Sequence, residues 1–183
     1  MAVRVPIVTP VAVNRLQLPV TTSLDDFRAR YERAVPALDF DQVADFVARR
    51  APWAEMLEFI GAAAPFGFLI YWKNQADEVM RLAGDTAPCV AYLMGNHTIA
   101  ERMFRHNPAA MLYAPLRTVL WQDSSSQAWF AVDQPSTQFG SFSDPRITAT
   151  GRDLDAELAV LLAHLGLDVP PALLPVDLPP KLP

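Results

Sequence analysis

The sequence predicts an α+β domain, and three observations lead to this prediction. Short runs of aromatic and β-branched residues have the length of strands, and two of them flank a short polar turn, as in an antiparallel hairpin. Other segments carry apolar residues at helical spacing. The chain has 183 residues, 51% of them hydrophobic and 19% charged, which is enough apolar surface for one core. We therefore expect a single α+β domain over residues 1–168.

The N-terminal part is expected to form a strand and then a helix. Residues 11–18 alternate imperfectly between the two faces of a strand, and Pro19 closes it. Ser23 can then cap a helix that begins at Leu24, because its hydroxyl accepts hydrogen bonds from amides that the first turn leaves exposed. Acidic residues early in this segment and basic residues late in it suit the helix dipole. We expect the helix to end near Pro36.

A helical insert is expected over about residues 39–63. Asp39 or Asp41 can cap a helix that runs to about Arg50. Pro52 fits the first turn of another helix, because its fixed φ suits that position and its missing N–H is not needed there. Apolar residues of this second helix recur at helical spacing, at Trp53, Met56, Leu57 and Ile60.

The middle of the chain alternates between strand and helix patterns. Residues 67–72 form an aromatic and β-branched run that predicts a strand. Residues 76–83 predict a helix that Gly84 stops. Residues 89–94 predict a largely buried strand, and Gly95-Asn96 forms the turn that follows it.

A helix and a hairpin are expected after this turn. The helix covers residues 97–106 and ends at Asn107-Pro108. The hairpin pairs residues 111–121 with residues 128–132. Pro115 lies within the first of these strands, which suggests an edge strand or a bulge.

The C-terminal part is expected to form a helix and a tail. The helix begins at about Thr148 or Gly151, and its stripe of leucines should cover the sheet. Gly166 supplies its stop. Residues 169–183 form a Pro-rich tail whose composition favours extended backbone, either loose or docked on a neighbour.

Composition and charge exclude several classes of protein. The net charge is -5 and no run of Lys and Arg occurs, so nothing attracts a polyphosphate, and we expect no nucleic-acid partner. No apolar stretch approaches the roughly 18 residues that would predict a membrane-spanning helix, and we expect no signal peptide and no membrane partner. The lone cysteine, Cys89, excludes an intramolecular disulfide and a CxxC metal site, which suits a cytoplasmic protein.

Motifs of several common enzyme classes are missing from the sequence. There is no Gly-rich phosphate loop with Lys-Ser/Thr, no GxGxxG after a strand and no HExxH. No Ser lies in a GxSxG elbow. Nucleotide-binding, zinc-hydrolase and serine-hydrolase functions therefore lack their usual support.

His97 is the strongest candidate for a functional residue. It is expected at the start of a helix, where the dipole disfavours a protonated imidazole and keeps a nitrogen lone pair available to an acid or a metal. The plainer interpretation is that its imidazole bonds a neighbouring backbone group. His106 fits a cap near the other end of the same helix, and His164 has no assigned role.

A dense set of aromatic and thioether side chains surrounds His97 in the sequence. Such residues usually form ordinary core, and Cys89 is expected to be a small buried hydrophobe rather than a nucleophile. If the set is not fully closed over, it lines a pocket for a flat apolar ligand. The residues singled out for such a pocket are Met94, Met103, Phe104 and Tyr113, taken from a set that comprises Phe66, Phe68, Tyr71, Trp72, Tyr92, Met94, Met103, Phe104, Met111, Tyr113, Trp121, Trp129 and Phe130.

Arg117 is the one cation expected in the middle of a strand near this set. If it is buried, its guanidinium needs a carboxylate, a carbonyl or a ligand anion, and Asp133 is the simplest partner. The strand alternation is equally compatible with Arg117 on a solvent face. The turn at residues 133–136 is either plain turn chemistry or a polar rim beside a site.

Three segments of the second half resemble the domain-of-unknown-function 302 family (DUF302). They are YLMGNHTIAERMFRHNP at residues 92–108, LYAPLR at residues 112–117 and VDQPS at residues 132–136. The resemblance implies a compact two-layer α+β fold, with helices packed on one face of a mainly antiparallel sheet, often as a dimer, and no settled reaction. Haem binding is a further implication. Shorter members look more like Cys-Asn-Pro at the turn where this chain has Gly95-Asn96-His97.

The resulting hypothesis is a homodimeric protein that binds haem or a similar flat apolar cofactor. His97 would be the axial metal ligand, and Arg117 would contact an acidic substituent. The walls would be the aromatic and methionine side chains, including Met94, Met103, Phe104 and Tyr113. An open sixth position on the iron would allow gas binding or peroxide-type activity.

Two functions from other classes stay open. The first is a cofactor-free enzyme on a small molecule, in which His97 is the general base and Asp133 or Glu101 orients it. The second is a structural or interaction module, in which the Pro-rich tail docks on a partner and no histidine has a chemical role. The sequence does not decide whether any reaction is catalysed.

Overall fold

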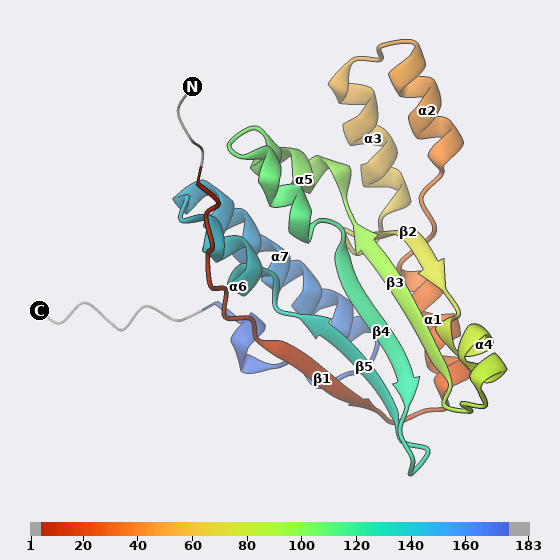
Figure 1. The fold of residues 1–183 in the computed structure, drawn as a ribbon. Coiled ribbons are helices and arrows are strands. Elements are labelled where there is room, and N and C mark those ends of the chain that lie inside the picture. The colour runs from red at the N-terminus through yellow and green to blue at the C-terminus, as the bar shows by residue number, and fades with distance from the viewer. Residues whose placement is uncertain (1–4, 176–183) are drawn as a thin grey trace, which may run out of the picture.

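A five-stranded antiparallel sheet is the centre of the computed structural model, which describes residues 5–175 (Figure 1). The strand order is β1-β5-β4-β3-β2, and every neighbouring pair is antiparallel. β4 and β5 form the expected hairpin. The strands are β1 (Arg15–Val20), β2 (Leu69–Asn74), β3 (Cys89–Gly95), β4 (Leu116–Gln122) and β5 (Ala128–Asp133).

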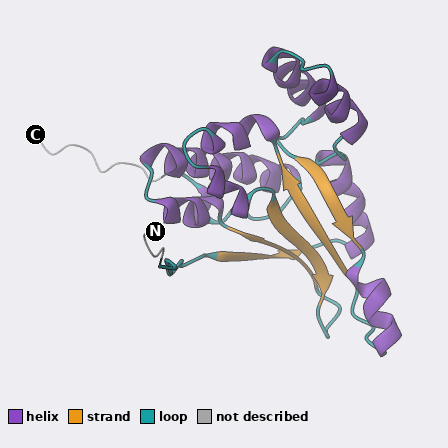
Figure 2. Ribbon diagram, turned by 45° about the horizontal axis from the view of Figure 1, so that its top comes forward, coloured by secondary structure: helices purple, strands orange, loops and turns teal. Residues whose placement is uncertain are grey.

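Helices cover one face of this sheet and form the second layer (Figure 2). α1 and α7 lie behind the strands in Figure 1, and α5 and α6 pack against α7 at one end of the sheet. The α+β fold with helices on a mainly antiparallel sheet is thus confirmed. The helices are α1 (Leu24–Ala34), α2 (Phe40–Ala48), α3 (Trp53–Ala63), α4 (Ala76–Met80), α5 (His97–Phe104), α6 (Pro135–Phe139) and α7 (Pro145–His164).

Local capping chemistry explains why several helices begin where the sequence predicted. The Ser23 hydroxyl accepts from the Asp26 amide at the start of α1, and the Asp39 carboxylate accepts from the Gln42 amide at the start of α2. Of the two capping residues considered for α2, Asp39 is therefore the one used. Gly84 ends the short helical segment after α4 with a left-handed backbone, φ +93°.

The first strand differs from the prediction in extent. Residues 11–14 lie outside it, and β1 continues through Pro19 to Val20. Pro19 is tolerated because β1 is an edge strand, where a missing N–H costs no ladder bond to a further strand.

Three other boundaries were wrong for reasons of local capping and tertiary contact. Residues 111–113 belong to a short 3-10 helix, η2 (Pro108–Tyr113), because Asn107 caps it and Pro108 opens it, so the strand begins only at Leu116. The turn expected at residues 133–136 is shorter, because α6 begins at Pro135. α7 begins at Pro145 with Asp144 as its cap, and Gly151 lies inside the helix rather than at its start.

The main core fills the space between the sheet and α1 and α7. Its largest buried side chains include Tyr31 of α1, Tyr92 of β3 and Phe130 of β5. The ring of Tyr92 packs edge-on against that of Tyr31, with centroids 5.1 Å apart, and the ring of Phe130 packs tilted against it, with centroids 5.8 Å apart. The Tyr31 hydroxyl is satisfied inside this core by Thr118 Oγ1 at 2.9 Å. The leucine stripe of α7 covers the sheet as expected, with Leu158, Leu161 and Leu162 fully buried.

The expected helical insert is a hairpin of α2 and α3 that stands out beside β2 (Figure 1). It has a small core of its own, built on Leu38, Met56, Ile60 and Leu69. No residue of α2 is buried, and Phe40 and Val47 are 53% and 72% exposed. This hairpin therefore rests on the edge of the domain rather than in its core.

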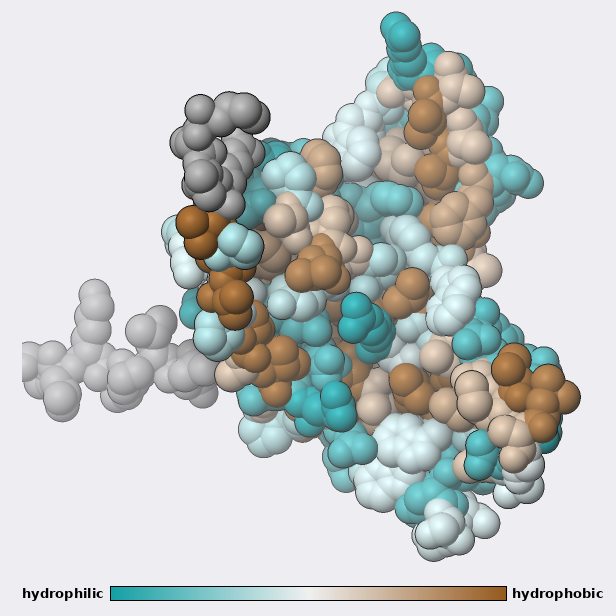
Figure 3. All heavy atoms as spheres, in the orientation of Figure 1, coloured by the Kyte–Doolittle hydropathy of each residue, from teal (hydrophilic) through white to brown (hydrophobic). Residues whose placement is uncertain are grey.

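The other face of the sheet faces the viewer in Figure 3, and no helix of the described part of the chain covers it. Trp121 and Trp129 stack there with centroids 6.1 Å apart. Arg117 is exposed on this face, and Asp133 on the neighbouring strand pairs with Arg15 at 3.5 Å. The solvent-facing alternative for Arg117 is thus the one that the structure has.

The described part of the Pro-rich tail packs on the domain itself. Leu173 is buried, and the carbonyl oxygen of Ala172 accepts a hydrogen bond from Gln134 Nε2. Residues 176–183 of the expected tail lie outside the described residues. Within residues 5–175, no helix is both long enough and apolar enough to cross a bilayer.

Candidate functional site

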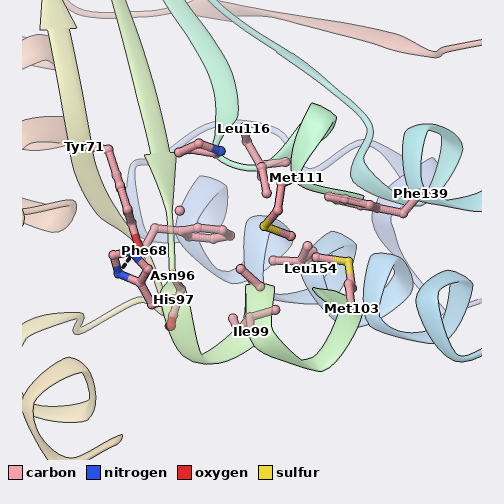
Figure 4. A pocket seen from close by; sticks show the side chains of 14 residues that line it. Phe68, Tyr71, Asn96, His97, Ile99, Met103, Met111, Leu116, Phe139 and Leu154 are labelled. Carbon is pink, nitrogen blue, oxygen red and sulfur yellow. Dashed lines mark hydrogen bonds between the residues drawn. The ribbon is translucent and has the colours of Figure 1, made fainter. Parts of the chain in front are cut away.

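A cavity of about 280 Å³ lies at the end of the sheet where β2, β3 and β4 meet α5, η2, α6 and α7 (Figure 4). Its walls are apolar except on the side of β2 and the start of α5. Figure 4 shows the thioethers of Met103 and Met111 on one side and the side chains of Tyr71 and His97 on the other. The lining residues are Phe68, Tyr71, Gly95, Asn96, His97, Ile99, Ala100, Met103, Met111, Ala114, Pro115, Leu116, Phe139 and Leu154.

His97 is the first residue of α5, and Asn96 sets its position. The Asn96 side-chain oxygen accepts from the Thr98 amide and from the Thr98 hydroxyl, which caps the helix. The Asn96 amide nitrogen donates to the carbonyl oxygen of Gly67, at 2.9 Å, and so ties the start of α5 to the loop before β2. The expected Gly-Asn turn is therefore a helix cap that carries the histidine.

Tyr71 and His97 form the polar side of the cavity. The Tyr71 hydroxyl and His97 Nδ1 are 2.8 Å apart and hydrogen-bonded, and the ring centroids are 4.9 Å apart. Burial lowers the pKa of His97 below its usual value, so the imidazole is neutral at pH 7. Burial likewise raises the pKa of Tyr71, and a hydrogen bond from the His97 backbone amide opposes that rise. The pair is thus a phenol and a neutral imidazole.

A β-bulge places Tyr71 in the cavity wall. Ile70 pairs with Met94 and Trp72 pairs with Leu93, so β2 has one residue more than β3 at this point, and that residue is Tyr71. A bulge takes a side chain out of regular alternation and re-aims it. Tyr71 belongs to the aromatic set expected to form core or a pocket wall, but its pairing with His97 was not predicted, because a bulge depends on the pairing of two strands and leaves no mark in one sequence.

The predicted site residues are only partly brought together. His97 and Met103 line the cavity. Met94 is fully buried in the main core, where its sulfur accepts from the Tyr31 hydroxyl at 3.3 Å. The other three lie elsewhere: Phe104 is 50% exposed, Tyr113 packs on Phe139 and Phe142, and Arg117 is on the open face of the sheet.

The groups considered as partners for His97 lie elsewhere. Glu101 pairs with Arg105 on the same helix, and Asp133 pairs with Arg15. His106 and His164 do not line the cavity. Among residues 5–175, no three His, Cys, Asp or Glu side chains are grouped so as to hold a metal ion.

Glu157 of α7 lies against the same loop that Asn96 holds. Its Oε2 is buried and has no hydrogen-bond partner among the described residues. Burial raises the pKa of this carboxyl to about 7, helped by Asp153 and opposed by Arg102. Glu157 does not line the cavity, but it touches Gly67, whose carbonyl oxygen binds the cap of α5.

Comparison with known proteins places this chain in a family. The model of the family described as "Domain of unknown function DUF302" matches residues 58–165, which is more than half of the chain and includes β2 to β5 and all of α7. None of the curated proteins compared with the chain matches it.

A solved structure has the same fold. It is the crystal structure of an uncharacterised conserved DUF302 protein from Bacillus stearothermophilus, with a TM-score of 0.59 and 18% sequence identity. The alignment covers 82% of this chain and 97% of that one. At this identity the likeness concerns the fold.

Proposed function

Because the chain belongs to the DUF302 family, whose domains are of unknown function, we propose its function from its own cavity: it is a ligand-binding protein that takes a small, flat, mainly apolar molecule. His97 is the polar contact in this proposal. The observation that carries it is a cavity walled by Met, Leu, Ile and Phe side chains with one hydrogen-bonded polar pair at its side. Few placed polar groups in an otherwise apolar cavity are typical of small-molecule sites.

The size of the cavity limits the ligand. Its volume of about 280 Å³ lies just below the roughly 300–1,000 Å³ of pockets that enclose drug-sized molecules. A molecule of one or two rings matches this volume. The thioethers of Met103 and Met111 suit such a ligand, because methionine side chains adapt to irregular shapes and favour contact with aromatic edges.

Haem, the larger cofactor expected from the resemblance, fits these residues only in part. The cavity can enclose one edge of a porphyrin but not the whole ring. No Lys or Arg among residues 5–175 lines it, and Arg117, expected to meet an acidic substituent, is on the open face of the sheet. His97 Nε2 could ligate iron only if Nδ1 carried the proton and donated it to Tyr71.

The test is binding in solution, followed at the methionine methyl groups. We expect benzene or toluene, added to protein with ¹³C-labelled methionine methyls, to shift the Met103 and Met111 signals and to leave that of exposed Met80 in place. Unmoved Met103 and Met111 signals at saturating probe would overturn the proposal. A haem titration of the wild type, His97→Ala and His106→Ala followed by absorbance tests the larger cofactor, which requires a Soret change that only His97→Ala removes.

One observation favours catalysis as a second candidate function. With its ring hydrogen on Nδ1 and donated to Tyr71, a neutral imidazole can accept a proton at Nε2 from a bound molecule, and Tyr71 then orients the imidazole in the place of the Asp133 or Glu101 that the sequence suggested. In this version the ligand is a substrate with an acidic C–H. Exchange of such a proton for deuterium, lost in His97→Ala, is the measurement that tests it.

The proposal also covers the oligomeric state of the protein and its location in the cell. We expect a homodimer, and light scattering in solution tests it. We also expect the cytoplasm, which suits the single unpaired Cys89.

A further inference from the structure

We infer that Tyr71 holds His97 in the tautomer that carries its proton on Nε2, so that the cavity offers a hydrogen-bond donor and selects an uncharged ligand with a carbonyl-type acceptor. The part of this inference that concerns the ligand rests on the proposed function. The part that concerns the tautomer is a property of the protein alone.

The phenol of Tyr71 has one place for its hydrogen. Among the described residues, the acceptor within hydrogen-bond distance of its hydroxyl is His97 Nδ1, at 2.8 Å. Because a half-buried O–H that finds no acceptor is costly, the stable arrangement has the Tyr71 hydroxyl donating its hydrogen to Nδ1.

The imidazole then has its single proton on the other nitrogen. His97 is half-buried at the positive end of α5, and both the burial and the helix dipole disfavour a second proton on the ring. With Nδ1 accepting from Tyr71, the neutral ring carries its hydrogen on Nε2. Nε2 makes no hydrogen bond to any described residue, so it is the ring atom left for a ligand.

The remaining lining decides the charge of the ligand. None of the described residues around the cavity is Asp, Glu, Lys or Arg. The side-chain oxygen of Asn96 already accepts from Thr98, and its amide nitrogen donates to Gly67. A charged ligand would lose its hydration without gaining an opposite charge, whereas a carbonyl oxygen gains the Nε2–H donor.

The tautomer is measured without any ligand. Long-range ¹H–¹⁵N correlations of the His97 ring at pH 7.5 should give the pattern of an Nε2–H imidazole in the wild type. Tyr71→Phe, which removes the donor, should give a mixture of tautomers. Tyr113→Phe is the matched control, because Tyr113 packs on Phe139 and Phe142 and does not touch His97, and it should leave the pattern unchanged. A wild-type Nδ1–H pattern would overturn the inference.

The ligand class is measured with three probes of similar shape. Acetophenone carries the carbonyl, α-methylstyrene replaces its oxygen with CH₂, and benzoate carries a charge. We expect acetophenone to bind about fivefold more tightly than α-methylstyrene, the effect of one net hydrogen bond, and benzoate not to bind. His97→Ala should bring the first two probes to equal affinity, with the Met103 and Met111 methyls as the readout.

The outcomes separate this inference from the proposed function. Equal binding of acetophenone and α-methylstyrene by the wild type would overturn the selection of a carbonyl and leave the apolar site standing. Binding of benzoate as tight as that of acetophenone would overturn the uncharged ligand. If no probe shifts the two methyls, the proposed function fails, and the ligand part of the inference fails with it.

Discussion

The carboxyl group of Glu157 lies directly on the backbone of Gly67: a Cβ atom added to Gly67 would stand 2.4 Å from Glu157 Oε2. Gly67 also has a positive φ of +76°, which side chains rarely adopt. Its carbonyl oxygen accepts the hydrogen bond from Asn96 that holds the start of α5. The backbone at this position therefore favours glycine, and an added Cβ would also have to displace the Glu157 carboxyl.

Gly67→Ala should destabilise the protein by more than backbone strain at this residue alone would. The positive φ costs about 1–2 kcal/mol for a residue with a Cβ, and the contact with Glu157 adds to this. Gly84→Ala is the matched control, because Gly84 has φ +93° and open space around it. Urea denaturation should give a larger loss for Gly67→Ala, and Gly67→Ala/Glu157→Ala should recover the excess. Equal losses at the two glycines would contradict the contact.

The buried carboxyl of Glu157 should make stability fall as the pH rises. Its pKa of about 7 in the folded state exceeds the ordinary 4.5, so the folded state binds this proton more tightly than the unfolded chain. The resulting stabilisation is complete below pH 4.5 and is lost as the pH rises through 7, by roughly 1–3 kcal/mol.

Glu157→Gln removes this titration and keeps the shape of the side chain. Relative to the wild type, its melting temperature should rise between pH 4.5 and pH 8. Glu58→Gln, at an exposed position of α3, should track the wild type throughout. Parallel wild-type and Glu157→Gln curves over this range would show that Glu157 is not protonated in the folded state.

The hydroxyl groups of Tyr31 and Thr118 should depend on each other. Both side chains are fully buried, and their oxygens are 2.9 Å apart. Tyr31→Phe leaves the Thr118 hydroxyl without this partner, at a cost of about 1–3 kcal/mol. Thr118→Val together with Tyr31→Phe should cost less than the sum of the single changes, in a double-mutant cycle by denaturation. Strict additivity would mean that the two groups do not interact.

Two helical glycines should respond to alanine with opposite signs. Gly61 in α3 has open space, so Gly61→Ala should stabilise by about 0.5–1 kcal/mol. Gly151 in α7 faces α6, where a Cβ would meet the Cβ of Phe139 at 3.0 Å and the Cα of Ser136 at 3.1 Å. Gly151→Ala should therefore destabilise, and calorimetry of the two variants measures the difference. A stabilising Gly151→Ala would mean that α6 moves aside at little cost.

Elements governed by local chemistry could be predicted from the sequence. Ser23 and Asp39 cap helices through their own side chains and the next amides, so the signal lies within four residues. The start of α7 was misjudged because a glycine suggests the end of a helix, and Gly151 was taken to mark that end. A glycine stands at this position because α6, from another part of the chain, approaches α7 closely there. Local patterns do not record such contacts.

The candidate site likewise combines features that the local sequence reveals with features that depend on contacts from elsewhere in the chain. His97 was found because a helix N-terminus and a titratable ring are both visible in sequence. The contact of Tyr71 with His97 was missed because the bulge in β2 exists only in the pairing with β3. Arg117 was placed on the correct strand, but only the packing of the helices decides which face of a sheet becomes core.

Because Tyr71 is the extra residue in β2, a change in the length of this strand would change the chemistry of the cavity. A shortening by one residue at Tyr71 would restore regular alternation with β3 and remove the phenol from His97, while α5, η2 and α7 kept their lining side chains. Such a deletion falls on the last strand of the sheet, next to the bridge that joins Ile70 to Ala37. Members of one fold could thus diverge in what they bind through insertions and deletions at an edge, with the apolar wall conserved.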